Sequence, residues 1–177
     1  MRAFAPNHFR NTKQPVFNLA KVARVFLYIF PTLFLASMAN AQLNVTATAT
    51  NFTIDFDATV AGVNNGSFAG SGFSGTPGAG ELDADAWATS GMSEGAKAFG
   101  TNNTAGDHAR GTHTGGTGTG GFFAFNVGGG DDALGFQPAG SDVTPGSVTL
   151  MVDNNTGSLI SDLTVSYEVW EYNDQPR

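Results

Sequence analysis

The chain has 177 residues, a formal net charge of −7, 24 glycines and no cysteine. Without cysteine no disulfide can hold the fold together, so its stability must come from a hydrophobic core. The length is sufficient for one such core and hardly for two.

The first 41 residues have the three zones of an export signal. Five basic residues come first, namely Arg2, Arg10, Lys13, Lys21 and Arg24. A largely apolar run of twelve residues (25–36) follows, and Ala39-Asn40-Ala41 supplies a small-x-small cleavage pattern before Gln42. A bilayer core needs about 20 apolar residues, so this run is too short to span one. We therefore predict a Sec-type signal peptide (1–41), cleavage between Ala41 and Gln42, a secreted or cell-surface location and no membrane span after cleavage.

Cleavage would change the charge of the protein strongly. All fifteen acidic residues follow residue 41, where only Lys97, Arg110 and Arg177 are basic, so the mature charge is 3 − 15 = −12. Nucleic acid is therefore excluded as an expected partner, because binding it depends on Lys and Arg that neutralise phosphates. We divide the mature part into a lead-in (42–50) and one domain (51–177).

The hydrophobic pattern of this domain has a period of two, which is typical of strands with one buried face. Strong alternation predicts strands at 52–56, 122–127, 147–152 and 163–170, with weaker candidates at 86–89, 96–99 and 133–136. The Asn- and Gly-containing turn at 153–157 joins two of the strong strands and predicts a β-hairpin over 147–172. Short strands with Gly/Pro turns predict an all-β fold, an antiparallel β-sandwich of jelly-roll type that is incomplete at its C-terminus.

The run 111–121 (GTHTGGTGTGG) allows two interpretations. Its six glycines are typical of a mobile linker, yet it leads directly into the apolar strand at 122–127. An ordered loop along the sheet and a mobile loop both remain open.

Several stretches together resemble a known kind of module. They are 81–100, 106–121, 123–130, 135–138, 141–146 and 167–177. In these stretches the chain is similar to the N-terminal β-sandwich module of large secreted or surface proteins of Bacteroidetes-type bacteria. Such modules stand ahead of lamin-tail, nuclease or phosphatase domains or type IX sorting tails, and the resemblance implies no catalytic residues for the module itself. It also implies further strands after residue 177, so we expect a truncated chain whose downstream domains are missing.

Loop carboxylates are the first candidates for a binding site. Asp83 and Asp85 form an Asp-x-Asp pair, and Asp131 and Asp132 follow three glycines. Loop oxygens at such spacing can bind Ca²⁺, although no EF-hand pattern is present. The alternative is that these four acids are plain solvated charges, in which case the protein has no cofactor.

Three other groups of residues carry weaker signals. His108 and His113 have the spacing of a metal pair but lie in a Gly-Thr loop, where no helix aligns them. Asp55 and Asp57 could form the carboxylate pair of a glycoside hydrolase. The aromatic residues Trp87, Tyr167, Trp170 and Tyr172 could stack on sugars or pack in the core.

Three functions follow from these patterns. The first is a non-catalytic structural or accessory module of an exported bacterial protein, with another surface protein as partner. The second is a carbohydrate-binding module that uses aromatic residues and Ca²⁺, with a glycan as ligand. The third is a hydrolase with a carboxylate pair.

Overall fold

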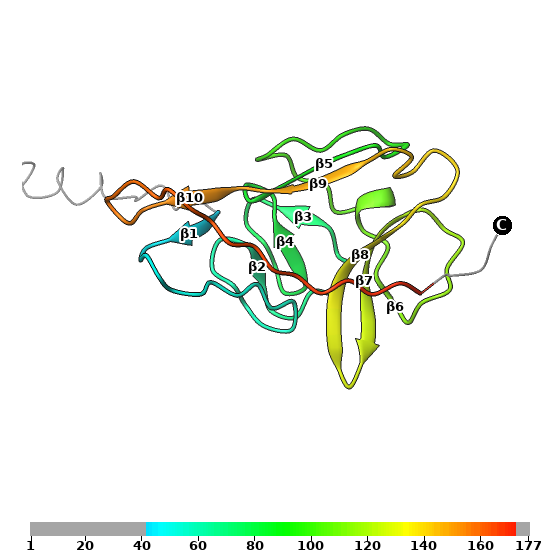
Figure 1. Cartoon of the computed structure of the whole chain (residues 1–177). Coiled ribbons are helices and arrows are strands. Elements are labelled where there is room, and N and C mark those ends of the chain that lie inside the picture. The colour runs from blue at the N-terminus through cyan, green and yellow to red at the C-terminus, as the bar shows by residue number, and fades with distance from the viewer. Residues whose placement is uncertain (1–41, 173–177) are drawn as a thin grey trace, which may run out of the picture. The chain divides into compact units, whose positions relative to one another are not determined.

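The computed structural model describes residues 42–172, and over this range the chain is all-β (Figure 1). The strands are β1 (Leu43–Val45), β2 (Asn64–Asn65), β3 (Phe73–Ser74), β4 (Glu81–Asp83), β5 (Trp87–Ser90), β6 (Thr112–His113), β7 (Gly121–Gly128), β8 (Asp131–Gln137), β9 (Ser147–Leu150) and β10 (Val152–Asn154). Within the same range the only helical element is the 3₁₀ turn η1 (Gly106–His108). The predicted all-β class is confirmed.

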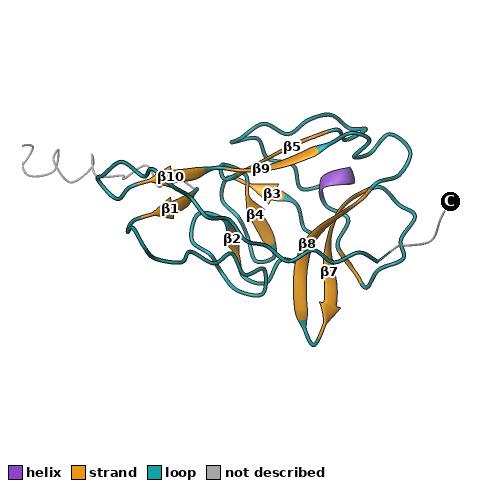
Figure 2. Cartoon of the chain, viewed as in Figure 1, coloured by secondary structure: helices purple, strands orange, loops and turns teal. Residues whose placement is uncertain are grey.

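The strands form four small sheets joined by long loops (Figure 2). Their orders are β1-β10, β2-β4-β3, β5-β9 and β6-β7-β8. The pairs β2-β4, β5-β9 and β7-β8 are antiparallel, whereas β1-β10, β3-β4 and β6-β7 are parallel. The prediction of antiparallel pairing is thus correct for half of the pairs.

The hairpin β7-β8 is the longest regular element. The predicted strand 122–127 lies in β7 and the weaker candidate 133–136 lies in β8, with Phe122 opposite Phe136. At the end of β7 and in the turn to β8, Gly128, Gly129 and Gly130 have φ angles of +109°, +69° and +88°. A side chain at φ > 0 is strained, so three successive glycines allow the tight reversal here.

The core is built mainly from short strands and the loops beside them. Its buried residues are Val63, Phe68, Phe73, Leu82, Ala84, Ala86, Trp87 and Ala124. The indole Nε1 of Trp87 donates a hydrogen bond of 3.0 Å to the carbonyl oxygen of Val63, which satisfies its polar atom inside the core. Phe73 packs edge-on against Phe122 at 5.9 Å between ring centroids, and this contact joins β3 to β7.

The predicted hairpin over 147–172 is wrong. Residues 147–150 form β9, which pairs with β5 and places Leu150 opposite Trp87; residues 152–154 form β10, which pairs with β1. The pairing of β9 with β5 buries Trp87 and half-buries Leu150. This packing would be lost if β9 paired within the predicted hairpin instead. Residues 163–170 therefore have no strand partner among the described residues, and every one of them is exposed.

The predicted strand at 52–56 is also wrong as a strand, although its alternation is real. Phe52, Ile54 and Phe56 are half-buried, and Ile54 and Phe56 pack against the core, while Thr53 and Asp55 between them are exposed. No ladder forms along this stretch, and one backbone hydrogen bond, from the amide of Phe68 to the carbonyl oxygen of Phe56 (2.7 Å), joins it to the core.

The lead-in, the glycine run and the signal peptide were also predicted from the sequence. The lead-in contributes β1, whose Val45 is buried. The glycine run supplies β6, a two-residue edge strand beside β7, and its last residue, Gly121, begins β7; the rest of the run forms loop. The signal peptide and Ala41 lie outside the described residues, while Gln42 is the first residue inside them. Between residues 42 and 172, no helix is long and apolar enough to cross a membrane.

Candidate functional site

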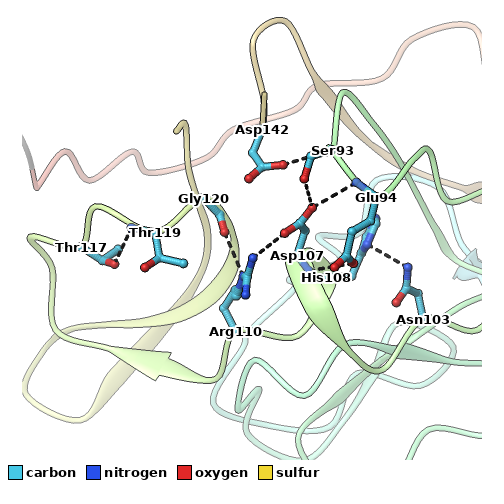
Figure 3. Close-up of polar contacts among 10 residues, drawn as sticks. All are labelled: Ser93, Glu94, Asn103, Asp107, His108, Arg110, Thr117, Thr119, Gly120 and Asp142. Carbon is cyan, nitrogen blue, oxygen red and sulfur yellow. Dashed lines mark hydrogen bonds and ion pairs between the residues drawn. The ribbon is translucent and has the colours of Figure 1, made fainter. Parts of the chain in front are cut away.

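The most concentrated polar chemistry of the described region lies around Asp107 in η1 (Figure 3). Its side chain is 2% exposed and accepts hydrogen bonds from the hydroxyl of Ser93 (2.6 Å) and the amide of Glu94 (3.2 Å). The Glu94 carboxylate in turn accepts the amide of Asp107 at 3.0 Å. Arg110 pairs with the other carboxylate oxygen of Asp107 and donates through Nε to the carbonyl oxygen of Gly120 at 2.9 Å. The carboxylate thus ties its own segment to the loop at 93–94, and Arg110 extends the network to Gly120.

The groups around Asp107 offset the effect of burial on its pKa. Burial alone would raise the pKa of Asp107, but the hydrogen bonds from Ser93 and Glu94 and the charge of Arg110 outweigh it and hold that pKa below its ordinary value. Asp142, in the loop between β8 and β9, adds a further tie because it accepts the amide of Ser93 at 2.7 Å. Asp107 is therefore an ionised carboxylate with a full set of donors.

His108, the next residue, is equally enclosed. Its Nδ1 lies 2.8 Å from the amide nitrogen of Asn103, and its Nε2 lies 2.9 Å from the hydroxyl of Thr89. An amide nitrogen can only donate, so Nδ1 must accept and the neutral ring carries its proton on Nε2. The ring also stacks on Phe122 at 5.8 Å between centroids. Burial lowers the pKa of His108, with the Lys97 charge acting in the same direction against the nearby carboxylates.

Lys97 is the third buried ionisable residue, with 2% of its surface exposed. Its ammonium donates to the carbonyl oxygens of Ala84 (2.9 Å), Trp87 (2.5 Å) and Ala98 (3.2 Å), and it lies 4.9 Å from the centroid of the Phe73 ring. Burial lowers its pKa to about 8, although Asp85 and Asp83 partly oppose the shift. The lysine therefore ties the loop at 97–98 to the segment that joins β4 and β5.

A shallow groove of about 440 Å³ lies on the β6-β7-β8 sheet. Its lining residues are Thr112, His113, Thr114, Asn126 and Asp132. Tyr172 borders it, because the phenol donates to the carbonyl oxygen of Asn126 at 3.0 Å and the ring stacks on Phe125 at 5.8 Å between centroids. The groove combines hydroxyl, imidazole, amide and carboxylate groups with an aromatic edge.

The four predicted calcium ligands lie in two separate places, Asp83 and Asp85 at the end of β4 and in the turn after it, and Asp131 and Asp132 at the start of β8. Asp83 is buried at the end of β4, where its carboxylate accepts the amide of Asp85 at 3.0 Å and burial raises its pKa. Asp131 and Asp132 begin β8, and Asp132 accepts hydrogen bonds from Ser67 and Asn126. Across residues 42–172, no group of three or more His, Cys, Asp or Glu side chains is arranged to hold a metal ion. Calcium binding through these acids stays a prediction.

The other predicted residues are distributed as follows. His108 is buried and bonded to Thr89 and Asn103, whereas His113 lies in the groove and its Nδ1 accepts the amide of Gly115 at 3.1 Å. The structure thus gives these two histidines separate surroundings, as their loop position had suggested.

Asp55 and Asp57 lie near the start of β8 rather than in a cleft of their own. Asp57 accepts the amide of Asp132 at 2.8 Å, and Asp55 accepts the amide of Asp57 at 2.9 Å. Partial loss of water and the charges of Asp57, Asp55 and Glu168 raise the pKa of Asp131. Of the aromatic candidates, Trp87 is buried, whereas Tyr167, Trp170 and Tyr172 are exposed.

Sequence reasoning did not identify the network around Asp107. Its members come from segments as distant as Thr89 and Asp142, and no local spacing signals their meeting. A polar residue in an otherwise apolar stretch, such as Lys97 between Ala96 and Ala98, is the one local sign that a charge is buried.

The chain was compared with models of protein families, with curated proteins and with solved structures, and none of them matches it. The resemblance to the Bacteroidetes-type surface module therefore stays a prediction that only the residues of this chain support.

Proposed function

We propose that this chain is an exported, non-catalytic structural or accessory β-module of a bacterial surface or secreted protein. The single observation that carries the proposal is the use made of the buried ionisable residues. Lys97, Asp107 and His108 each form hydrogen bonds to other segments of the chain, and these bonds use their charge and hydrogen-bonding capacity to brace the fold. A group bonded in this way would have to break the brace before it could react with a substrate.

Export is supported by the order of the basic, apolar and small-residue zones in residues 1–41. The test is the intact mass of the protein released from cells that express the full chain. We expect a mature form that begins at Gln42. A released form that retains residues 25–36 would contradict the export proposal.

The absence of turnover is tested separately. The released protein is screened with chromogenic glycosides, esters and phosphate esters, beside an Asp55→Asn/Asp57→Asn double variant. We expect both proteins to match the buffer blank. Turnover by the unmodified protein that the double variant lacks would favour the carboxylate-pair hydrolase instead.

A second candidate, a Ca²⁺-assisted carbohydrate-binding module, is favoured by the groove beside Tyr172. Hydroxyl, amide and carboxylate groups next to an aromatic ring provide the hydrogen bonds and the apolar stacking surface that sugars require. The test is a glycan array with and without a calcium chelator. Binding that chelation abolishes, that Tyr172→Ala and Asp132→Asn weaken and that Glu171→Gln preserves would support this candidate. An array with no bound glycan would reject it.

A further inference from the structure

Residues 163–170 form an extended segment that no other part of the described chain covers (Figure 1). Within residues 42–172, no hydrogen bond reaches the backbone of this segment, and β10 before it ends at Asn154. Both edges of the segment are therefore free. A free strand edge is a template on which another strand can pair.

The side chains of the segment strengthen this conclusion. Leu163, Val165, Tyr167 and Val169 alternate with polar residues, and they are 69%, 70%, 82% and 76% exposed. Four large apolar residues in one row are more than the isolated exposed side chains that are usual on a monomer. The row has the pattern of a strand that is buried on one face in a larger assembly.

We propose that residues 163–170 pair antiparallel with the same residues of a second copy of this chain, about a two-fold axis at Ser166. This register places Val165 opposite Tyr167 and Leu163 opposite Val169, so that every apolar residue of the row meets another one. A two-fold axis at Tyr167 would instead place Leu163 opposite Glu171. The axis at Ser166 is thus the one that matches the apolar row to itself, and cross-strand pairs are the unit of sheet stability.

The same register also keeps the carboxylates of the two copies from lying directly opposite each other. With the axis at Ser166, Glu168 lies opposite Thr164 and Asp162 lies opposite Trp170. No carboxylate faces another across the pair, although the chain is acidic overall. Opposed like charges destabilise a strand pair, and this register avoids them.

The pairing is expected to be reversible. After the segment, Tyr172 stacks on Phe125 of β7; before it, the nearest strand is β10, which ends at Asn154. A two-stranded ribbon by itself is only marginally stable in water, so we expect a dimer that forms as concentration rises. This inference concerns assembly alone, and it holds or fails independently of whether the module is catalytic.

The absence of cysteine makes a direct test possible. In the proposed register the two copies of residue 166 face each other with Cα atoms about 5 Å apart, which is within reach of a disulfide. Ser166→Cys should therefore form a covalent dimer under mild oxidation. In the matched control Thr164→Cys, the two cysteines are offset by four residues, or about 13 Å, and should not join.

The unlinked protein supplies a second readout, sedimentation at increasing concentration. We expect a monomer–dimer equilibrium that Tyr167→Lys weakens by about tenfold, since it alters two cross-strand pairs of the dimer. Thr164→Lys, which faces Glu168, should leave the dimer unchanged or strengthen it. A protein that stays monomeric, aggregates without a defined size or cross-links equally well through either cysteine would overturn the proposal.

Discussion

Replacing Asp107 by Asn tests whether the buried polar network braces the fold. The substitution keeps the size of the side chain but removes its charge, and it places an amide group where Ser93, Glu94 and Arg110 all donate. At least one of these donors must then remain without an acceptor. The tie between the loop that contains η1 and the loop after β5 is weakened, although the bond from the Asp107 amide to the Glu94 carboxylate remains.

The magnitude follows from the same contacts. A hydrogen bond to a charged group contributes about 1.5–3 kcal/mol, and Arg110 is partly solvated, so its share lies at the low end. We expect Asp107→Asn to lower the free energy of unfolding by about 2–4 kcal/mol. For a domain of this size the melting temperature should fall by roughly 10 °C.

Urea unfolding followed by tryptophan fluorescence measures this change, because Trp87 is buried in the core. The exposed Glu171→Gln is the matched control and should stay within about 0.5 kcal/mol of the unmodified protein. The folded-state pKa of Asp107 is depressed, so its contribution is present above about pH 4 and is lost as pH falls through the folded-state value. The free energies of unfolding of Asp107→Asn and of the unmodified protein should therefore converge at acid pH. Equal stability of Asp107→Asn and Glu171→Gln at pH 7 would refute the bracing role.

Two further predictions concern Lys97 and Gly70. The pKa of Lys97 falls from 10.5 to about 8 on folding, so the unfolded chain binds more protons between these values and the stability due to this residue should rise with pH across that window. This rise in the free energy of unfolding, about 1–3 kcal/mol, should be absent from Lys97→Met. If the stability of Lys97→Met and that of the unmodified protein changed with pH in parallel, the lowered pKa of Lys97 would be contradicted. At Gly70 (φ +65°) an added Cβ would overlap the carbonyl group of Gly111, whereas at Gly116 (φ +71°) it would meet open space. Gly70→Ala should therefore destabilise the protein by about 1–3 kcal/mol more than Gly116→Ala in urea unfolding, and equal losses would show that the close approach to Gly111 is not tight.

The sequence predicted the elements that depend on local pattern. Alternation identified β7 because Phe123 and Phe125 lie in one row, and the glycines after it identified the turn to β8. The weaker candidate at 86–89 became β5. The same alternation was misleading at 163–170, because period two describes a strand but does not say which strand covers it.

The local sequence pattern could not predict the buried polar network for a related reason. His108 reads as a loop histidine in sequence, and its burial depends on Thr89, Asn103 and Phe122, each from a different segment. Lys97 likewise reaches carbonyl groups at Ala84 and Trp87 that only the folded chain places together. Only the fold determines which polar residues meet. The spacing of His108 and His113 along the sequence could therefore suggest a metal pair but could not reveal the buried hydrogen-bond network.

The state of the His108 ring tests most directly the claim that the buried ionisable groups serve the fold. Nitrogen NMR of the labelled protein distinguishes the two neutral tautomers and follows protonation with pH. We expect the tautomer with the proton on Nε2 and a ring whose pKa lies below its ordinary value, since burial lowers that pKa and Asn103 occupies Nδ1. A His108 ring that titrates at or above its ordinary value, or that carries its proton on Nδ1, would contradict the account.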